Sequence, residues 1–384
     1  MFESRLYLTN GVISYELDAF NGEPLAFTRE DRADNARKNH FLGITGVLDG
    51  EIYLDGEARH LNIPRYAQIR KNPEAKPEIT VKQGDGEAEA EIFYPKLVAA
   101  GEMVDVSARV RLHLPKNSCE SIWKLKLENA TDNEITKLSF PELSGLWLGD
   151  AWEDNTLMLP RVSGSKVENP TKVLADKPTV IMWKWQEYLH RYMLNRNGTE
   201  DDRGLHIYRC PYTGGGSMLW MDLYSRAENS GIYITARDEK MHLADVHAYA
   251  IGEYCPGIGM GVCHNPCLKK GVWESPEGIL AFHEGDWHWA ADTYRAMRDS
   301  YNKPLLHTPA APDWFTRSPG LAAHYDFKYQ SGGIVHTFAD IPALYKKAQT
   351  WGLDHLLIAG WHEDGFDCGF PHYSLTRNWA ARKP

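Results

Sequence analysis

The sequence of 384 residues contains few cysteines, no cluster of basic residues and no long apolar run. Six cysteines are too few for a disulfide framework in a chain of this length. The 42 lysines and arginines against 52 aspartates and glutamates give a net charge of −10, which disfavours nucleic-acid binding. The longest apolar runs, such as 356–359, are far shorter than the about 20 residues of a membrane helix. We therefore expect neither a nucleic-acid partner nor a membrane partner.

Signals for export and for nucleotide binding are also missing. The amino end has no basic segment followed by an apolar one, so we expect a cytoplasmic protein. The chain has no GxGxxG, P-loop or G-x-S-x-G motif, and we expect no cofactor. With 43% hydrophobic residues, 24% charged residues and no low-complexity stretch, it is typical of a globular protein of two to three domains.

The 13 tryptophans are unevenly distributed. None precedes Trp123, and seven lie between Trp273 and Trp379. Indoles pack well in cores and also stack on the flat faces of sugar rings. The count alone favours core packing and leaves sugar stacking open.

The first 275 or so residues alternate apolar and polar positions with period two. In 104–114, Val104, Val106, Ala108, Val110, Leu112 and Leu114 share one face, and polar residues occupy the other. This alternation predicts a half-buried antiparallel strand. A turn at 115–118 and a second alternating run from Trp123 predict a hairpin. Further short strands are predicted at 12–20, 88–94, 217–224 and 231–237, so the expected fold is a large antiparallel β-sandwich.

The pattern changes after residue 282. A helical period runs from Trp287 to Tyr301, and a proline-rich connector follows. Strands are then predicted at 320–327 and 353–359, with a helix between them that Gly352 ends. The predicted domains are a sandwich (1–282), a linker helix with its connector (283–318) and the start of an incomplete TIM-type (β/α)8 barrel (319–384). Two parallel strands can neither close a barrel nor cover both faces of their sheet.

The densest polar segment, 360–373, follows the second predicted parallel strand. In βα barrels, the loop after a strand's carboxyl end lines the active site. Carboxylates accept hydrogen bonds from sugar hydroxyls, and aromatic rings stack on sugars. We predict a substrate-binding loop rather than a solvated one, with these residues: Trp361, His362, Asp364, Asp367 and Tyr373.

Three more residues are candidates for the same site. Asp326 ends the first predicted parallel strand and faces the same rim or caps the following turn. Trp183 and Trp185 lie on one face of a predicted strand. They pack in the sandwich core or reach over the barrel mouth as part of a loop.

Two metal-site hypotheses are weak. Cys255, Cys263, His264 and Cys267 form a C-x7-C-H-x2-C pattern that lacks the paired C-x2-C spacing of structural zinc sites. His362, Asp364, Asp367 and His372 match no closed metal site either. We predict no metal.

The sequence resembles sandwich-plus-barrel glycosidases. It carries G-D-W-H-x-x-A-x-x-Y-R at 285–295 and M-x-W-M-D-L-Y at 218–224. At 360–373 it matches a G-W-H-x-x-G-x-D-x-x-x-P-x-Y motif. That motif is typical of a largely uncharacterised bacterial glycoside-hydrolase-like family, distantly similar to the α-galactosidase-like group with galactose mutarotase-like supersandwich domains. The resemblance implies that the motif loop binds substrate and that the catalytic acid pair lies on later barrel strands.

The carboxyl end departs from this family. Relatives continue with a P-D-P-x-L-G segment, whereas this chain ends with residues 374–384 in another pattern. A reading frame that starts one base earlier in this tail could encode the P-D-P-x-L-G segment. We therefore hypothesise a frameshift near residue 373 that truncated a longer enzyme.

Three functions follow from the sequence. The first is the amino-terminal part of a glycoside hydrolase that acts on an oligosaccharide or glycoside, with its carboxylate pair on missing strands. The second is a non-catalytic carbohydrate-binding or assembly module. The third is a mutarotase-like epimerase with a His/Glu pair on the sandwich, which the barrel start disfavours. The catalytic residues, the sugar and the oligomeric state do not follow from the sequence.

Overall fold

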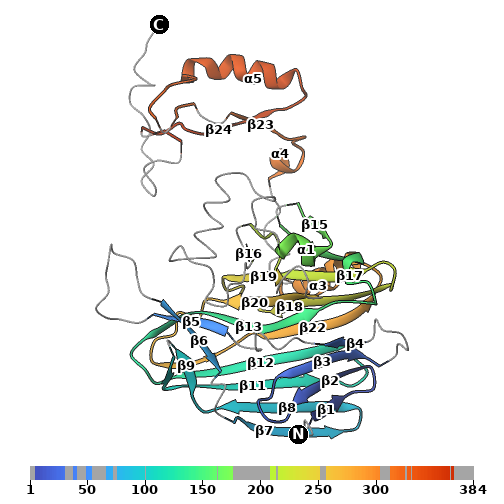
Figure 1. Cartoon of the computed structure of the whole chain (residues 1–384). Helices are drawn as coiled ribbons and strands as arrows, with labels where there is room; N and C mark the ends of the chain where they lie inside the picture. The colour runs from blue at the N-terminus through green and yellow to red at the C-terminus, as the bar shows by residue number, and fades with distance from the viewer. Residues whose placement is uncertain are drawn as a thin grey trace. The chain divides into compact units, whose positions relative to one another are not determined.

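The computed structural model describes most of the chain and divides it into two compact units, Met1–Tyr301 and Asn302–Pro384 (Figure 1). The described residues are 5–30, 38–40, 49–53, 66–71, 76–99, 101–161, 163–175, 208–212, 215–250, 257–302, 312–324, 327–329, 331–363 and 365–366.

Unit 1 consists mainly of antiparallel sheets. Sheet A has the order β1-β2-β3-β4, formed by Arg5–Thr9, Ile13–Asp18, Pro24–Arg29 and Lys38–His40. Sheet B has the order β10-β9-β6-β5-β13-β20-β19-β16, formed by Glu102–Val104, Leu97–Ala99, Tyr66–Lys71, Asp49–Tyr53, Glu134–Leu146, Ile258–His264, Ala244–Ala250 and Tyr208–Tyr212.

Sheet C is the largest of the three. Its order is β15-β14-β17-β18-β22-β12-β11-β8-β7, formed by Ser165–Glu168, Asn155–Leu159, Trp220–Ser225, Ser230–Arg237, Glu277–Glu284, Glu120–Asn129, Val106–Leu114, Glu87–Tyr94 and Glu78–Gly84. The strand β21 (Gly271–Glu274) also pairs with β12. Two short helical segments, η2 (Trp152–Asp154) and α1 (Pro170–Ala175), complete the described elements before α3.

The alternation in the sequence produces the predicted hairpin. β11 pairs with β12 so that Leu112 lies opposite Trp123 and Val110 opposite Leu125. These side chains are buried, whereas Arg109 and Arg111 on the other face are exposed. Because side chains alternate along a strand, each strand buries one face. The same face of β11 and β12 contributes to the hydrophobic core of the unit.

The core lies between the faces of the sheets. Leu138 of β13 and Val246 and Met260 of neighbouring strands belong to the same buried cluster as Leu112 and Trp123 of sheet C. Sheet A covers another part of sheet C, where Phe27 stacks on Phe282 with ring centroids 4.3 Å apart. The predicted β-sandwich is therefore confirmed.

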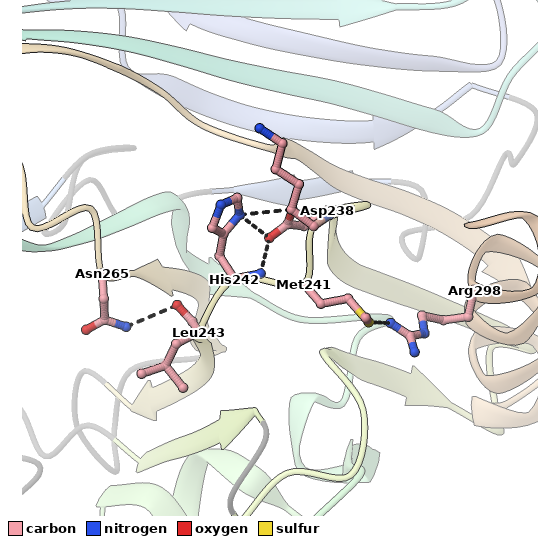
Figure 2. Close-up of polar contacts among 7 residues, drawn as sticks. Asp238, Met241, His242, Leu243, Asn265 and Arg298 are labelled. Carbon is pink, nitrogen blue, oxygen red and sulfur yellow. Dashed lines mark hydrogen bonds and ion pairs between the residues drawn. The ribbon is translucent and has the colours of Figure 1, made fainter. Parts of the chain in front are cut away.

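A turn at 238–243 carries the chain from β18 in sheet C to β19 in sheet B (Figure 2). The Asp238 carboxylate accepts a hydrogen bond from the His242 backbone N–H at 2.7 Å and lies 2.9 Å from its Nδ1. Asn265 Nδ2 donates to the Leu243 carbonyl at 3.3 Å, and Arg298 contacts the Met241 sulfur. The turn is thus held by Asp238 within it, by Asn265 just after β20 and by Arg298 of the helix at 287–302.

Helix α3 (Trp287–Asn302) packs on sheet C, where its Trp289 ring meets the rings of His283 and Tyr233. Ala290 and Tyr294 of this helix are buried. Tyr294 Oη accepts a hydrogen bond from the Leu219 N–H at 3.2 Å, just before β17. The helix begins where the helical period predicts it.

Unit 2 contains a parallel strand pair and one longer helix. β23 (Leu321–His324) pairs with β24 (His355–Ile358), in the register Leu321 opposite His355. Between them lie η5 (Phe338–Asp340) and α5 (Ile341–Gln349), and α4 (Asp313–Thr316) precedes β23. The βαβ order is as predicted, and the predicted domain boundaries and barrel remain predictions. Among the described residues, no helix has the length and apolar character to span a membrane.

Candidate functional site

The predicted binding loop begins directly after β24, at the carboxyl end of the parallel pair. Its backbone lies against the segment after β23: the Phe327 N–H donates to the Ala359 carbonyl at 3.0 Å. Farther along, the Phe366 N–H donates to the Lys328 carbonyl at 2.9 Å. The two loops therefore lie side by side, as expected for consecutive parallel strands.

Two glycines of the motif permit this close approach. Gly360 has φ 72° and Gly365 has φ 86°, a region that side chains other than glycine rarely adopt. A Cβ atom on Gly360 would lie 2.7 Å from the Lys328 carbonyl oxygen, and one on Gly365 would lie 2.2 Å from that of Tyr329. The motif glycines thus have a structural role in joining the two loops.

Imidazole and aromatic rings gather at this end of the pair. His324 ends β23, and its ring centroid lies 6.1 Å from that of His336 and 6.4 Å from that of Phe327. Trp361 contacts His362 edge-on at 5.6 Å. His362 is buried, whereas Trp361 is partly exposed. Among the described residues, Trp361 is therefore the predicted ligand-stacking residue with an accessible face.

The other predicted site residues lie outside the described residues. These are Asp326, Asp364, Asp367, Tyr373, Trp183 and Trp185. Their place in the site remains a prediction.

The opposite end of the parallel pair holds a Ser–His–Asp group that is not a catalytic triad. Ser318 Oγ lies 3.0 Å from His355 Nδ1, and Asp354 Oδ1 lies 2.6 Å from the same nitrogen. A triad needs the serine and the carboxylate on different imidazole nitrogens. The group instead fixes the start of β24, and the Ser318 hydrogen bond lowers the pKa of Asp354.

Unit 1 contains a polar network that no sequence motif predicts. It lies on the face of sheet B opposite the core. His247 Nε2 of β19 is 3.0 Å from Glu142 Oε2 of β13, and Tyr249 Oη donates to Glu142 Oε1 at 3.1 Å. The His247 and Tyr249 rings stack at 6.3 Å, and Arg209 of β16 is the cross-strand neighbour of His247.

A β-bulge places Glu142 on this face. β13 pairs Ser139 with Cys263 and Glu142 with Gly261, so three residue steps on β13 oppose two on β20. The extra residue reverses the alternation, and Glu142 shares a face with Ser139. Gly261 lies between Glu142 and His247, where a Cβ atom would be 2.6 Å from the imidazole. Strict alternation would have directed Glu142 into the core, so sequence reasoning missed it.

Both side chains of the Glu142–His247 pair have no exposed surface. A carboxylate and an imidazole in contact can transfer protons, but such chemistry requires contact with a substrate. The buried pair links β13 to β19 across the intervening β20.

The described members of the cysteine and histidine pattern do not point toward one another. Cys263 and His264 are successive residues of β20 and project to opposite faces. His264 Nε2 lies 3.0 Å from the Phe140 carbonyl oxygen, so it donates a hydrogen bond there. Cys255 lies outside the described residues. Within the part of the chain that the structure describes, no three His, Cys, Asp or Glu side chains are placed to hold a metal ion.

Comparisons with known proteins give distant structural likenesses. No protein-family model and no curated protein matches the chain. α-Galactosidase AgaA from Geobacillus stearothermophilus is similar with a TM-score of 0.37 and 10% identity, over 98% of this chain and 53% of that one. The α-galactosidase from Lactobacillus brevis is similar with a TM-score of 0.42 and 8% identity, over 94% and 49%.

A galactose mutarotase related enzyme from Lactobacillus acidophilus is similar with a TM-score of 0.40 and 12% identity, over 74% of this chain and 99% of that one. These are the two groups that the sequence motifs resemble. Every TM-score is below 0.5, so the likeness does not establish membership of a family. The chain spans about half the length of the α-galactosidases.

Proposed function

We propose that the chain is a carbohydrate-active protein, the amino-terminal part of a glycoside hydrolase, that binds an oligosaccharide or glycoside through the loop after β24. One observation carries the proposal. The G-W-H-x-x-G loop lies at the carboxyl end of a parallel strand pair, held by Gly360 and Gly365 against the loop after β23. Binding loops occupy this end in barrel folds. Trp361 supplies a partly exposed aromatic face there, suited to stacking on a sugar ring.

Substitution of Trp361 tests the binding site. Trp361→Ala removes the aromatic face, and we expect the affinity for an oligosaccharide to fall about tenfold, which corresponds to ~1.4 kcal/mol. Trp351→Ala is the matched control, because Trp351 is an exposed tryptophan of the same unit that lies after α5 and packs with Lys347. Isothermal titration with a panel of α-galactosides and other oligosaccharides measures both. Equal affinities of the two variants would contradict the site.

A non-catalytic carbohydrate-binding module is the second candidate. The structure shows one parallel strand pair in unit 2 within the described residues, and a glycosidase needs two carboxylates across the scissile bond. Titration heat without release of reducing sugar would favour this module over the hydrolase. The epimerase is less favoured, because the His247–Glu142 pair on the sandwich is fully buried.

A further inference from the structure

A second buried carboxylate–histidine pair lies on sheet C beneath helix α3. Asp222 of β17 and His283 of β22 are in contact, with 2.7 Å between Oδ1 and Nε2. Both side chains have no exposed surface. Burying a carboxylate is costly unless a cation or several donors compensate it, so the state of His283 decides the stability of this contact.

Gly231 provides the room for the imidazole. It lies on β18 between the two strands, directly opposite Tyr224 of β17 and His283 of β22. A Cβ atom at Gly231 would be 2.1 Å from His283 Nε2. The imidazole therefore lies flat over the β18 backbone and spans one strand to reach Asp222.

Both ring nitrogens of His283 face acceptors. Nε2 faces Asp222, and Nδ1 lies 3.0 Å from the Glu284 carbonyl oxygen. A neutral imidazole can donate from only one nitrogen, so this geometry is satisfied by the imidazolium. Burial alone would lower the pKa of His283, but the hydrogen bond and charge of Asp222 raise it above the ordinary 6.5. Burial also raises the pKa of Asp222, against the opposing effect of His283, and the two acceptors place the proton on the imidazole.

Trp289, in the first turn of helix α3, stacks on the imidazolium ring of His283. The Trp289 and His283 rings are parallel within 2°, with centroids 4.6 Å apart. Trp289 also meets Tyr233 of β18 edge-on at 5.8 Å. A cation over an indole face is attracted by the ring's negative face. The imidazolium therefore links Asp222 on one side to the helix on the other.

Other charged groups surround the pair. Arg29 of β3 lies 3.2 Å from the Glu284 carboxylate and disfavours the charge on His283. Asp286, just before α3, and Tyr224 of β17 lie near Asp222. The positive charge of Arg226 favours the ionised forms of Asp286 and Tyr224 and so acts to lower the pKa of each. Only His283 contacts Asp222 as a cation among the described residues.

We propose that the Asp222–His283 pair is a proton-controlled anchor that holds helix α3 on sheet C. With the proton on His283, the imidazolium neutralises Asp222 and supports Trp289. When the proton leaves, the carboxylate stays buried without its cation, and the beginning of α3 separates from the sheet. Helix α3 begins two residues before Trp289, and unit 1 ends at Tyr301. This inference does not depend on the proposed carbohydrate function.

The direction of the pH effect follows from the raised pKa. The anchored state binds the proton more tightly than the open state, whose His283 has the ordinary pKa of 6.5. The anchor is therefore complete below pH 6.5 and weakens as the pH rises toward the pKa of the anchored state. Within that window the opening constant rises by up to about tenfold per pH unit.

Hydrogen–deuterium exchange of the full chain tests the anchor. Peptides from 287–302 are followed from about pH 6 to about pH 9, with intrinsic rates corrected at each pH. We expect the protection of α3 to fall across this range while β11 and β12 stay protected. Constant protection of α3, or an equal loss in β11 and β12, would overturn the proposal. Labelled-histidine NMR on the same protein measures the pKa of His283, and a value at or below 6.5 would overturn it as well.

Substitutions assign the effect to this pair. Asp222→Asn keeps the shape and removes the charge, so the pH dependence of α3 protection should disappear. His288→Gln and His242→Gln are matched controls, because each removes a histidine from an exposed His–Asp pair, the second shown in Figure 2. Both controls should keep the wild-type pH dependence. Retention of that dependence in Asp222→Asn, or its loss in a control, would refute the assignment.

Discussion

Glycines on the strands of unit 1 determine where the large polar rings lie. Gly261 and Gly231 each lie directly under a histidine ring. Each ring comes from the strand on one side of the glycine and reaches a carboxylate on the strand on its other side. Gly259 lies under the ring of Tyr249 in the same way, with a virtual Cβ 2.0 Å from Tyr249 Cζ. The two buried carboxylate–histidine pairs therefore depend on a residue that contributes no side chain.

A methyl group at Gly261 tests this dependence. Gly261→Ala places Cβ 2.6 Å from the His247 ring, and we expect the free energy of unfolding to fall by about 1–3 kcal/mol because the ring must leave Glu142. Gly84→Ala on the exposed β7 is the control, since a Cβ there meets nothing within 4 Å. Urea unfolding measures both variants. Equal effects would contradict this account of Gly261.

His264 gives unit 1 a sensitivity to acid. Burial lowers the pKa of His264 to about 4 from 6.5, so the folded state binds fewer protons than the unfolded state between these values. Stability contributed by the neutral imidazole is present above pH 6.5 and is lost as the pH falls toward 4, by up to about 3 kcal/mol. Urea unfolding of the wild type and of His264→Gln at several pH values checks this, because the variant should lose less stability in acid. The exposed His242→Gln should follow the wild type.

At the scale of elements, local capping determines where the unit 2 helix begins. Thr337 and Asp340 form a reciprocal capping box, in which the Asp340 carboxylate accepts from the Thr337 N–H at 2.7 Å. This box holds η5, from which α5 continues. Pro342 fits the first turn of α5, where no N–H partner is needed.

Removal of the capping hydroxyl should loosen this helix. Thr337→Ala removes the hydroxyl that donates to the Asp340 carboxylate at 3.0 Å, and we expect a loss of about 1 kcal/mol in the local stability of α5. Exchange of the α5 amides measures this loss. Thr350→Ala, at the other end of α5, should have a smaller effect, because its hydroxyl only adds a bond to the Lys347 carbonyl. A larger effect at Thr350 would contradict the capping account.

At the scale of the whole molecule, the two units differ in how fully they bury their strands. Strands such as β18 and β19 are buried along nearly their whole length. The apolar β24 has no fully buried residue, and Leu357 is 46% exposed. Parallel strands ordinarily have both faces covered, so β23 and β24 stabilise unit 2 less than the sandwich stabilises unit 1.

Unit 2 should therefore unfold before unit 1. In increasing urea, we expect peptides from 321–358 to lose exchange protection at lower concentration than peptides from 106–129. Leu112→Ala, in the core of β11, should lower the free energy of unfolding of unit 1 by about 2–5 kcal/mol and therefore lower its urea midpoint. The midpoint of unit 2 should not change. A single coincident transition in the wild type would show that the units unfold as one.

The sequence by itself predicts the repetitive features of this protein. Period-two alternation gives β11 and β12, and a helical period gives α3. The apolar run after Gly352 gives β24. These predictions succeed because each depends on which face of a regular element is buried, and spacing along the chain records that directly. The motif loop was located by the same logic, at the carboxyl end of a parallel strand.

Only the tertiary structure decided which polar groups meet. Glu142 faces His247 because a bulge in β13 reverses the alternation, and His283 reaches Asp222 because Gly231 leaves space on an intervening strand. The members of these pairs lie 105 and 61 residues apart in sequence. Contacts across strands depend on sheet order and register, which local propensity does not encode, so the buried carboxylate–histidine pairs appear only once the strands are assembled.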